Sequence, residues 1–294
     1  MTRMPPIAVL AGGLATRMRP STEHLPKSAP RSRRRTFCRA SAEAFCREGI
    51  RDAKLLVGYR WEQIELFVGD GSRFGVQVDY IVDGPTLLGT GGAVRRALQR
   101  LGPEFLVTYC DSWLDSPYAP VVEAFHASGR PALMCVFRNE NRWDASNVQF
   151  ENGVIRCYSK KFRLPEMHQI DWGLGMPKAS AVATRPMDEP WDLAELYEEL
   201  ATSGRLAGYE MARRFYEIGS FEELAETNRL LCAFCFRAPS SFVRSEAPRH
   251  NDQRGRQGPL HQLLVERLGR SLKYDEVYLD AHASVAKAKA GIGA

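Results

Sequence analysis

The stretch Ile7-Ala8-Val9-Leu10-Ala11-Gly12-Gly13 decides the fold of this chain. Its apolar part predicts a strand that is buried on both faces, as in a parallel sheet. The two glycines that follow lack Cβ atoms, so backbone N–H groups there can approach a phosphate closely. Arg17 and Lys27 come soon after, and their positive charges suit that phosphate. The opening predicts a phosphate-binding turn, although a bare Gly-Gly pair also occurs in ordinary strand-to-helix connections.

Length and composition set the broad class. The chain has 294 residues, 44% of them hydrophobic and 26% charged, which is ordinary for one large α/β domain with or without an appendage. No apolar run approaches the ~20 residues of a membrane span. The first strand is expected so early that no signal peptide fits before it. Seven cysteines at scattered spacings do not form a disulfide framework, so we expect a cytoplasmic protein without a membrane partner.

The net charge of +5 is local rather than spread over the chain. Five arginines account for it, all within residues 29–40: Arg31, Arg33, Arg34, Arg35 and Arg39. The remaining residues carry 35 cations and 35 anions. We therefore expect no basic face for nucleic acid.

Strands and helices are expected to alternate along the chain. Residues 53–59 and 76–82 predict strands, and residues 61–68 between them have apolar side chains at helical spacing. Residues 105–109 and 132–138 predict two further buried strands. This alternation predicts a mostly parallel sheet with helices on both faces.

A second glycine-rich motif, Leu88-Gly89-Thr90-Gly91-Gly92, opens a helix that is expected to run to about Arg100. Thr90 is a candidate N-cap, and the glycines would let a ligand approach the positively polarised helix start. A capped helix with a glycine-rich entry and no ligand is the plainer interpretation of the same residues.

Asp111 follows directly after the strand predicted at residues 105–109. Ligands in open α/β sheets gather at the carboxyl ends of the strands. A carboxylate oxygen is also a common ligand of Mg²⁺. Asp111 is therefore a candidate metal ligand.

Taken together, these motifs resemble the signatures of the sugar-phosphate nucleotidyltransferases, the enzymes that make nucleotide sugars. Leu-Ala-Gly-Gly-x-x-Thr-Arg-x-x-Pro at residues 10–20, Pro26-Lys27 and the motif at residues 88–92 carry the resemblance. Tyr-Glu-Ile-Gly-Ser at residues 216–220 is similar to the branch of heptose and mannose 1-phosphate guanylyltransferases. The resemblance implies a Rossmann-like α/β fold with a mostly parallel sheet, helices on both faces, a β-rich acceptor insert and a short C-terminal extension.

The activity that the resemblance implies is transfer of a nucleoside monophosphate from an NTP to a sugar 1-phosphate, giving an NDP-sugar and pyrophosphate. It implies catalytic roles for Arg17 on the β/γ-phosphates, Lys27 near the α-phosphate, and Asp111. Asp111 and Glu217 would hold Mg²⁺. The implied nucleotide-binding residues are Leu10, Ala11, Gly12, Gly13, Leu88, Gly89 and Thr90.

The acceptor side of the resemblance lies in a predicted hairpin around Asn152-Gly153 and in the strand after it. Asn147 would contact the sugar, and Lys160 would meet its phosphate, although each could equally be a solvated loop residue. Asp171 and the backbone near Gly173 would address sugar hydroxyls. They lie in Asp-Trp-Gly-Leu-Gly, which is similar to a family strand that has Tyr in place of Trp.

Two kinds of departure from the family pattern leave alternatives open. Residues 29–46 do not match, and they are either the product of two compensating frameshifts or a solvated basic loop that meets an anionic substrate. Cys110 and Phe221 replace a glycine and a proline. These changes favour a nucleotide-binding homologue with weak or no catalysis as one alternative function. A second alternative is a nucleotidyltransferase with a non-sugar phosphate acceptor such as phosphocholine.

We expect a nucleotidyltransferase domain over residues 1–231 and a C-terminal extension over residues 232–294. Residues 238–258 of the extension are rich in Pro, Ser, Arg, Gln and Gly, which is typical of a linker or a disordered segment. The expected partners are an NTP and a sugar 1-phosphate. Association into a homo-oligomer is left open.

Overall fold

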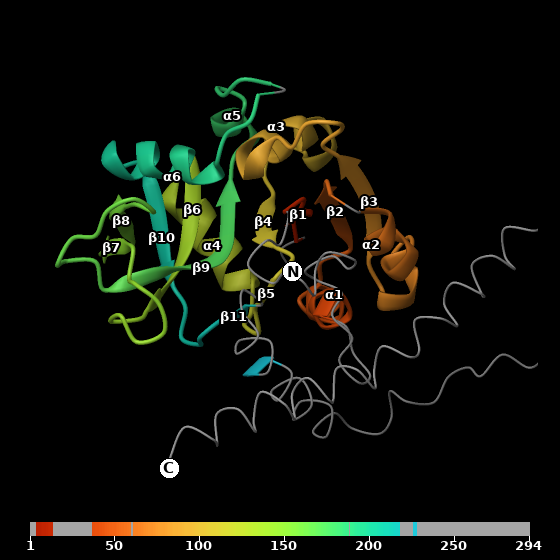
Figure 1. The fold of residues 1–294 in the computed structure, drawn as a ribbon. Coiled ribbons are helices and arrows are strands. Elements are labelled where there is room, and N and C mark those ends of the chain that lie inside the picture. The colour runs from red at the N-terminus through yellow and green to blue at the C-terminus, as the bar shows by residue number, and fades with distance from the viewer. Residues whose placement is uncertain (1–3, 14–36, 60, 188, 218–225, 228–294) are drawn as a thin grey trace, which may run out of the picture. The chain divides into compact units, whose positions relative to one another are not determined.

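The computed structural model describes residues 4–13, 37–59, 61–187, 189–217 and 226–227 (Figure 1). The helices are α1 (Phe37–Arg47), α2 (Trp61–Val68), η2 (Ser72–Phe74), α3 (Gly89–Leu101), α4 (Ala119–Ser128), α5 (Ala179–Val182) and α6 (Leu193–Thr202). The strands are β1 (Ile7–Ala11), β2 (Asp52–Val57), β3 (Gln77–Val82), β4 (Leu106–Tyr109), β5 (Ser112–Trp113), β6 (Ala132–Arg138), β7 (Val148–Glu151), β8 (Val154–Tyr158), β9 (Gln169–Pro177), β10 (Leu206–Glu210) and β11 (Tyr216–Glu217).

Nine of these strands form one sheet in the order β3-β2-β1-β4-β9-β6-β10-β8-β7. β1 lies between β2 and β4 and is parallel to both. β9 then runs antiparallel to β4 and to β6, and β10 returns parallel to β6. The predicted α/β sheet is confirmed. Its parallel half is built from the strands before residue 110, and its mixed half contains the β-rich region expected to bind the acceptor.

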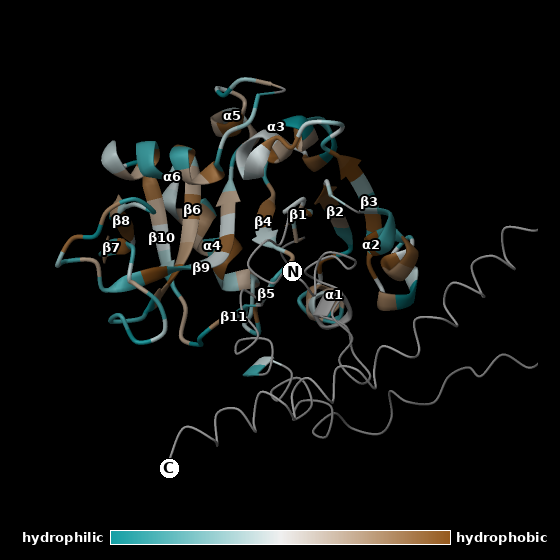
Figure 2. Ribbon diagram, in the orientation of Figure 1, coloured by the Kyte–Doolittle hydropathy of each residue, from teal (hydrophilic) through white to brown (hydrophobic). Residues whose placement is uncertain are grey.

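The alternation of side chains along β1 divides the core between the two faces of the sheet. Ile7, Val9 and Ala11 pack in one cluster with residues of α1, α2 and α4, whereas Ala8 and Leu10 pack in a second cluster with residues of α3 and α6. Helices therefore cover both faces, as the sequence predicts. Figure 2 shows the strands of the sheet largely brown and several helix turns teal, the pattern expected for amphipathic helices on a buried sheet.

The local predictions agree with the structure where the sequence pattern is strong. The helix predicted at residues 61–68 and the strand predicted at residues 132–138 have the predicted bounds. Asn152 and Gly153 have φ angles of 51° and 77°, so both central residues of the predicted hairpin turn adopt the left-handed conformation.

Residues 41–47 correct one of the two alternatives for residues 29–46, that of a solvated basic loop. They belong to α1, and Ala42, Ala44 and Phe45 are buried in it. The second half of this segment is therefore a packed helix. Residues 29–36, Phe221 and the extension over residues 232–294 lie outside the described residues. Within the part of the chain that is described, no helix is long and apolar enough to span a membrane.

Candidate active site

Three of the predicted functional segments lie side by side on neighbouring strands. The Cys110 N–H, just after β4, donates to the carbonyl of Leu10 in β1 over 3.0 Å. On the other side of β4, the Thr108 hydroxyl donates to the Gly173 carbonyl of β9 over 2.9 Å. A Cβ placed on Gly173 would lie 3.4 Å from the hydroxyl oxygen of Ser112. The glycine turn, the segment with Asp111 and the predicted acceptor strand thus meet at one edge of the sheet.

The backbones of the two predicted metal ligands, Asp111 and Glu217, lie close together because of a pair of very short strands. β5 and β11 pair antiparallel, with Glu217 opposite Ser112 and Tyr216 opposite Trp113. The rings of Tyr216 and Trp113 contact each other at a tilt of 39°, with centroids 6.0 Å apart. Since Asp111 immediately precedes Ser112, this pairing places the backbones of Asp111 and Glu217 next to each other.

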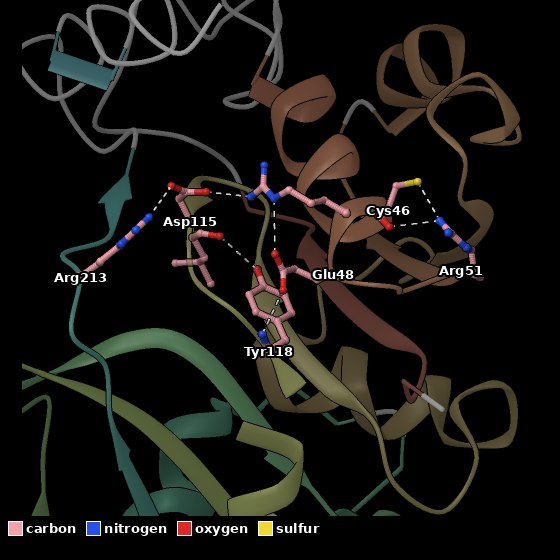
Figure 3. A network of polar contacts seen from close by, with 8 residues as sticks. Cys46, Glu48, Arg51, Asp115, Tyr118 and Arg213 are labelled. Carbon is pink, nitrogen blue, oxygen red and sulfur yellow. Dashed lines mark hydrogen bonds and ion pairs between the residues drawn. The ribbon is translucent and has the colours of Figure 1, made fainter. Parts of the chain in front are cut away.

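A network of ion pairs and hydrogen bonds next to the site holds together the chain segments that flank β5 and β11 (Figure 3). Asp115, two residues after β5, accepts from Arg47 over 2.7 Å and from Arg213 over 3.1 Å. Glu48 accepts the N–H of Tyr118 over 3.3 Å in the same network. The ion pair between Asp115 and Arg213 joins the segment after β5 to the segment before β11.

Trp172 explains the departure from the family's tyrosine at this position. The side chain is fully buried, and its indole N–H donates to the carbonyl of Arg213 over 2.7 Å. A tyrosine has no N–H to donate from that place on the ring. β9 therefore also helps to hold the chain that leads into β11.

The residues predicted to hold magnesium can be compared with the ligands that this ion usually has. Among the described residues no cluster of three or more His, Cys, Asp or Glu could hold a metal ion. Mg²⁺ is usually held by one or two carboxylates together with water and substrate phosphates rather than by an all-protein cage. Asp111 and Glu217, whose backbones are close, supply two carboxylates, and that number fits the pattern.

The glycine turn offers backbone rather than side chains to a ligand. Leu10 and Ala11 are buried in the core and paired within the sheet, so their side chains do not face a ligand. A Cβ on Gly12 would lie 3.4 Å from the carboxylate of the buried Asp83, whereas one on Gly13 would meet nothing within 4 Å. Gly13 is thus the open position. Arg17 and Lys27 lie outside the described residues.

The second glycine motif, at the start of α3, packs closely against Trp191. The N-cap of α3 is Leu88, whose side chain is buried and makes no capping bond, so the expectation that Thr90 caps the helix is wrong. The N–H groups of Gly91 and Gly92 donate to the carbonyl of Trp191 over 3.0 and 3.4 Å. A Cβ on Gly91 would overlap the Trp191 ring. The close approach of Trp191 therefore requires glycine at position 91. Gly89 is exposed, but a Cβ on it would lie 2.6 Å from the Trp191 carbonyl oxygen, so glycine is required there as well.

Replacement of Gly91 by Ala tests that packing, because the packing reverses the sign of the expected change in stability. Inside an ordinary helix the change is stabilising by about 1 kcal/mol. Here the new methyl group meets the indole, and overpacking costs about 1–3 kcal/mol. We expect Gly91→Ala to destabilise the protein in urea unfolding and to become neutral or stabilising in a Trp191→Ala background. A stabilising effect in both backgrounds would contradict the packing.

Asp192 links the nucleotide motif to the predicted acceptor lysine. As N-cap of α6, it accepts the N–H of Ala194 over 3.0 Å. The same carboxylate accepts the Thr90 hydroxyl over 2.8 Å and the Lys160 ammonium over 2.9 Å. An aspartate directly before a helix is a typical N-cap, whereas the two distant partners of Asp192 follow only from the structure. Thr90 and Lys160, predicted for different substrates, share one carboxylate.

Asn147 is hydrogen-bonded to the strand predicted to bind the acceptor. Its side-chain oxygen accepts the N–H of Asp171 over 3.0 Å, and Asp171 in turn accepts the N–H of Gly173 over 2.9 Å. Asn147 is half-buried, so the alternative of a solvated loop residue does not hold for it. Lys160 is exposed and held by its ion pair with Asp192.

Sequence reasoning missed a group of tyrosines around Asp171. Tyr158 donates a hydrogen bond to its carboxylate, and Tyr109 and Tyr197 lie close enough to respond to its charge. Burial raises the pKa of Asp171, against the lowering effects of the Gly173 N–H and Lys160. Burial also raises the pKa values of all three tyrosines, so their hydroxyls stay protonated at neutral pH.

The raised pKa of Asp171 predicts that its charge opposes folding. The folded protein holds the proton more tightly than the unfolded chain, so stability falls as pH rises from the unfolded pKa to the folded one. Asp171→Asn should therefore be more stable than the wild type at pH 7, with the gap closing as pH falls below the unfolded value of about 3.9. Urea unfolding across this pH range measures the gap.

Asp79 is the matched control with the opposite sign. Its hydrogen bond from the buried Lys54 amine, 2.6 Å long, lowers its pKa. Asp79→Asn should destabilise the protein at pH 7, and that loss should disappear as pH falls through the folded pKa. Equal behaviour of the two variants would contradict the environment assigned to Asp171.

Comparison with known proteins gives the family. The sequence profile described as nucleotidyl transferase matches residues 7–161, more than half of the chain. The chain belongs to the nucleotidyl transferase family. The matched range includes the glycine turn, the motif around Thr90, Asp111 and the hairpin that ends near Lys160.

Relatives of the chain are named as sugar-1-phosphate nucleotidyltransferases. A UTP–glucose-1-phosphate uridylyltransferase of Synechocystis is 27% identical over 214 residues, covering 67% of this chain and 55% of the relative. A D-glycero-α-D-manno-heptose 1-phosphate guanylyltransferase of Campylobacter jejuni is 29% identical over 155 residues, covering 53% and 68%. The chain spans between about a third and two thirds of the length of the first curated relatives it matches.

Solved structures confirm the fold. HddC from Yersinia pseudotuberculosis superposes with a TM-score of 0.66 at 19% identity, covering 78% of this chain and all of that one. At this identity the likeness concerns the arrangement of the sheet and its helices. The predicted Rossmann-like nucleotidyltransferase fold is therefore confirmed.

Proposed function

We propose that this protein transfers a nucleoside monophosphate from an NTP to a sugar 1-phosphate and releases pyrophosphate. One observation carries the proposal: the glycine turn after β1, the Asp111 segment after β4 and the acceptor strand β9 are direct neighbours, joined by the Cys110–Leu10 and Thr108–Gly173 hydrogen bonds. The named relatives support it, because they carry out this class of reaction. The two substrates would thus meet over Asp111.

The chemistry requires little proton transfer. A phosphate monoester is already a nucleophile, and its oxygen attacks the α-phosphorus of the NTP while the bond from that phosphorus to the bridging oxygen breaks. Pyrophosphate leaves on the opposite side with the bonding electrons. The protein's contribution is therefore to align the two phosphates and to offset their charge.

The residues present assign those tasks. Gly13 offers exposed backbone to the nucleotide phosphates, with Arg17 and Lys27 proposed as their cations. Lys160 is proposed to bind the acceptor phosphate from its place beside Asp192. Asp171, Asn147 and the Gly173 backbone are proposed to hold the sugar.

Asp111 and Glu217 would hold Mg²⁺ in this scheme. When bound, the ion supplies positive charge to the phosphates of the two substrates. We propose the cytoplasm as the compartment, because NTPs are made there and no disulfide occurs among the described cysteines.

The test is a matrix of five NTPs against sugar 1-phosphates and phosphocholine, measured as pyrophosphate release. We expect release with a sugar 1-phosphate and one preferred base, and the Tyr-Glu-Ile-Gly-Ser sequence favours guanine. Release with phosphocholine alone would support the alternative acceptor. NTP binding by calorimetry without release for any acceptor would support a non-catalytic homologue.

A further inference from the structure

A small cavity lies directly under the predicted acceptor residues. It has a volume of about 10 Å³, which is room for about one water-sized group. Tyr109, Asp171 and Gly173 line it and are half-buried, whereas Gly175 and Tyr197 line it and are buried. The cavity therefore leads from the acceptor site into the space between β9 and α6.

The hydroxyl of Tyr197 is unsatisfied in this cavity. The side chain is 5% exposed, and its oxygen has no hydrogen-bond partner among the described residues. A Cβ on Gly175 would overlap that oxygen, so the hydroxyl lies against the backbone of β9 at Gly175. Burying a hydroxyl without a partner is costly, and phenylalanine would fill the same space without that cost. The hydroxyl needs an explanation beyond packing.

We propose that the Tyr197 hydroxyl binds one neutral hydroxyl group of the acceptor sugar and is a specificity-determining residue of this enzyme. The inference rests on the proposed function and deepens it, because it names the group of the acceptor that the cavity takes. A tyrosine hydroxyl can both donate and accept, which matches a sugar hydroxyl.

The surroundings favour a neutral hydroxyl over a charged group. An anionic group would meet the Asp171 carboxylate at the mouth of the cavity. A cationic group larger than water does not fit the volume. The sugar hydroxyl would enter past Asp171. The Asp171 carboxylate can accept a hydrogen bond from a second hydroxyl group of the same sugar ring.

Tyr197→Phe removes the hydroxyl and nothing else. We expect kcat/KM for the acceptor to fall about 10-fold, with KM for the NTP unchanged, since one hydrogen bond is lost. The midpoint of thermal unfolding of the substrate-free protein should rise by about 2–4 °C, because an unpaired buried hydroxyl is gone. Function and stability should therefore move in opposite directions.

Tyr118→Phe is the matched control. Tyr118 is also buried, but its hydroxyl donates to the Leu114 carbonyl over 3.4 Å in the other core cluster. We expect this variant to lose stability and to keep the acceptor kcat/KM of the wild type. The contrast separates loss of a buried hydroxyl from loss of substrate recognition.

Deoxy analogues of the preferred sugar 1-phosphate complete the test. One analogue should react equally fast with the wild type and Tyr197→Phe, because it lacks the partner hydroxyl. An equal fall for every analogue, or lower stability of Tyr197→Phe with unchanged acceptor kinetics, would overturn the assignment. If the wild type itself releases no pyrophosphate with any acceptor, the proposed function fails; if both proteins are equally active on all acceptors, only the role of Tyr197 fails.

Discussion

Asp111→Asn should lower kcat by about 10³-fold or more, because a bound cation contributes several kcal/mol to charge stabilisation in phosphoryl transfer. Asparagine keeps the size of the side chain but removes the charge that attracts Mg²⁺. Asp111 is half-buried and stands between Cys110, tied to β1, and Ser112, paired with Glu217. Pyrophosphate release under saturating substrates measures the effect.

A second readout separates loss of the metal from loss of the fold. Mn²⁺ with NTP should raise the melting temperature of the wild type and leave that of Asp111→Asn nearly unchanged. Asp70→Asn, in the loop before η2, is the control and should keep wild-type turnover, since the Asp70 carboxylate accepts from the N–H and the hydroxyl of Ser72, far along the chain from the predicted site residues. Full activity of Asp111→Asn would refute the metal assignment.

Lys160→Met should lower kcat/KM for the acceptor by about 10²-fold while KM for the NTP stays the same. A charge-assisted hydrogen bond to phosphate is worth about 1.5–3 kcal/mol, and methionine keeps most of the length of the stem. The ammonium is held 2.9 Å from Asp192, so its position is set before the substrate arrives. Because it has three donors, it can keep that bond and still bind phosphate.

Lys161→Met is the matched control for this change. Lys161 is the next residue, also exposed, and its backbone N–H rather than its side chain bonds to Ser159. We expect its kinetics to be those of the wild type. If Lys161→Met loses acceptor affinity and Lys160→Met does not, the acceptor cation has been assigned to the wrong lysine.

The sequence alone predicts the parts of this fold that rest on local pattern. β1 is a continuous apolar run, α2 has a clear helical period, and Asn152-Gly153 is the preferred pair for a tight hairpin. In each, neighbouring residues carry the whole signal. These predictions are confirmed by the structure with the bounds that the pattern gives or within a few residues of them.

The remaining features depend on contacts between distant segments. β5 and β11 have two residues each, too few for a period, yet their pairing is what places Glu217 beside Asp111. From the sequence, the glycines of α3 suggest a helix start that binds a ligand. In the structure, Trp191 packs against them. No local pattern reports such a neighbour.

Tyr197 shows how a functional candidate can be hidden by a correct structural interpretation. Its spacing with Leu193, Leu196 and Leu200 predicts the buried face of a helix, and that face is buried. Only the surroundings of its oxygen, unpartnered among the described residues and beside a cavity, distinguish it from the leucines. Burial pattern predicts the position of a side chain, whereas its hydrogen-bonding depends on the tertiary structure.

The most direct test of the account follows the oxygen atoms of the acceptor phosphate. The central claim is that an oxygen of the sugar 1-phosphate attacks the α-phosphorus of the NTP over Asp111. With ¹⁸O in the non-bridging phosphate oxygens of the preferred sugar 1-phosphate, mass spectrometry should find all of the label in the NDP-sugar and none in pyrophosphate. Label in pyrophosphate, or hydrolysis of the NTP with the sugar phosphate unchanged, would contradict the account.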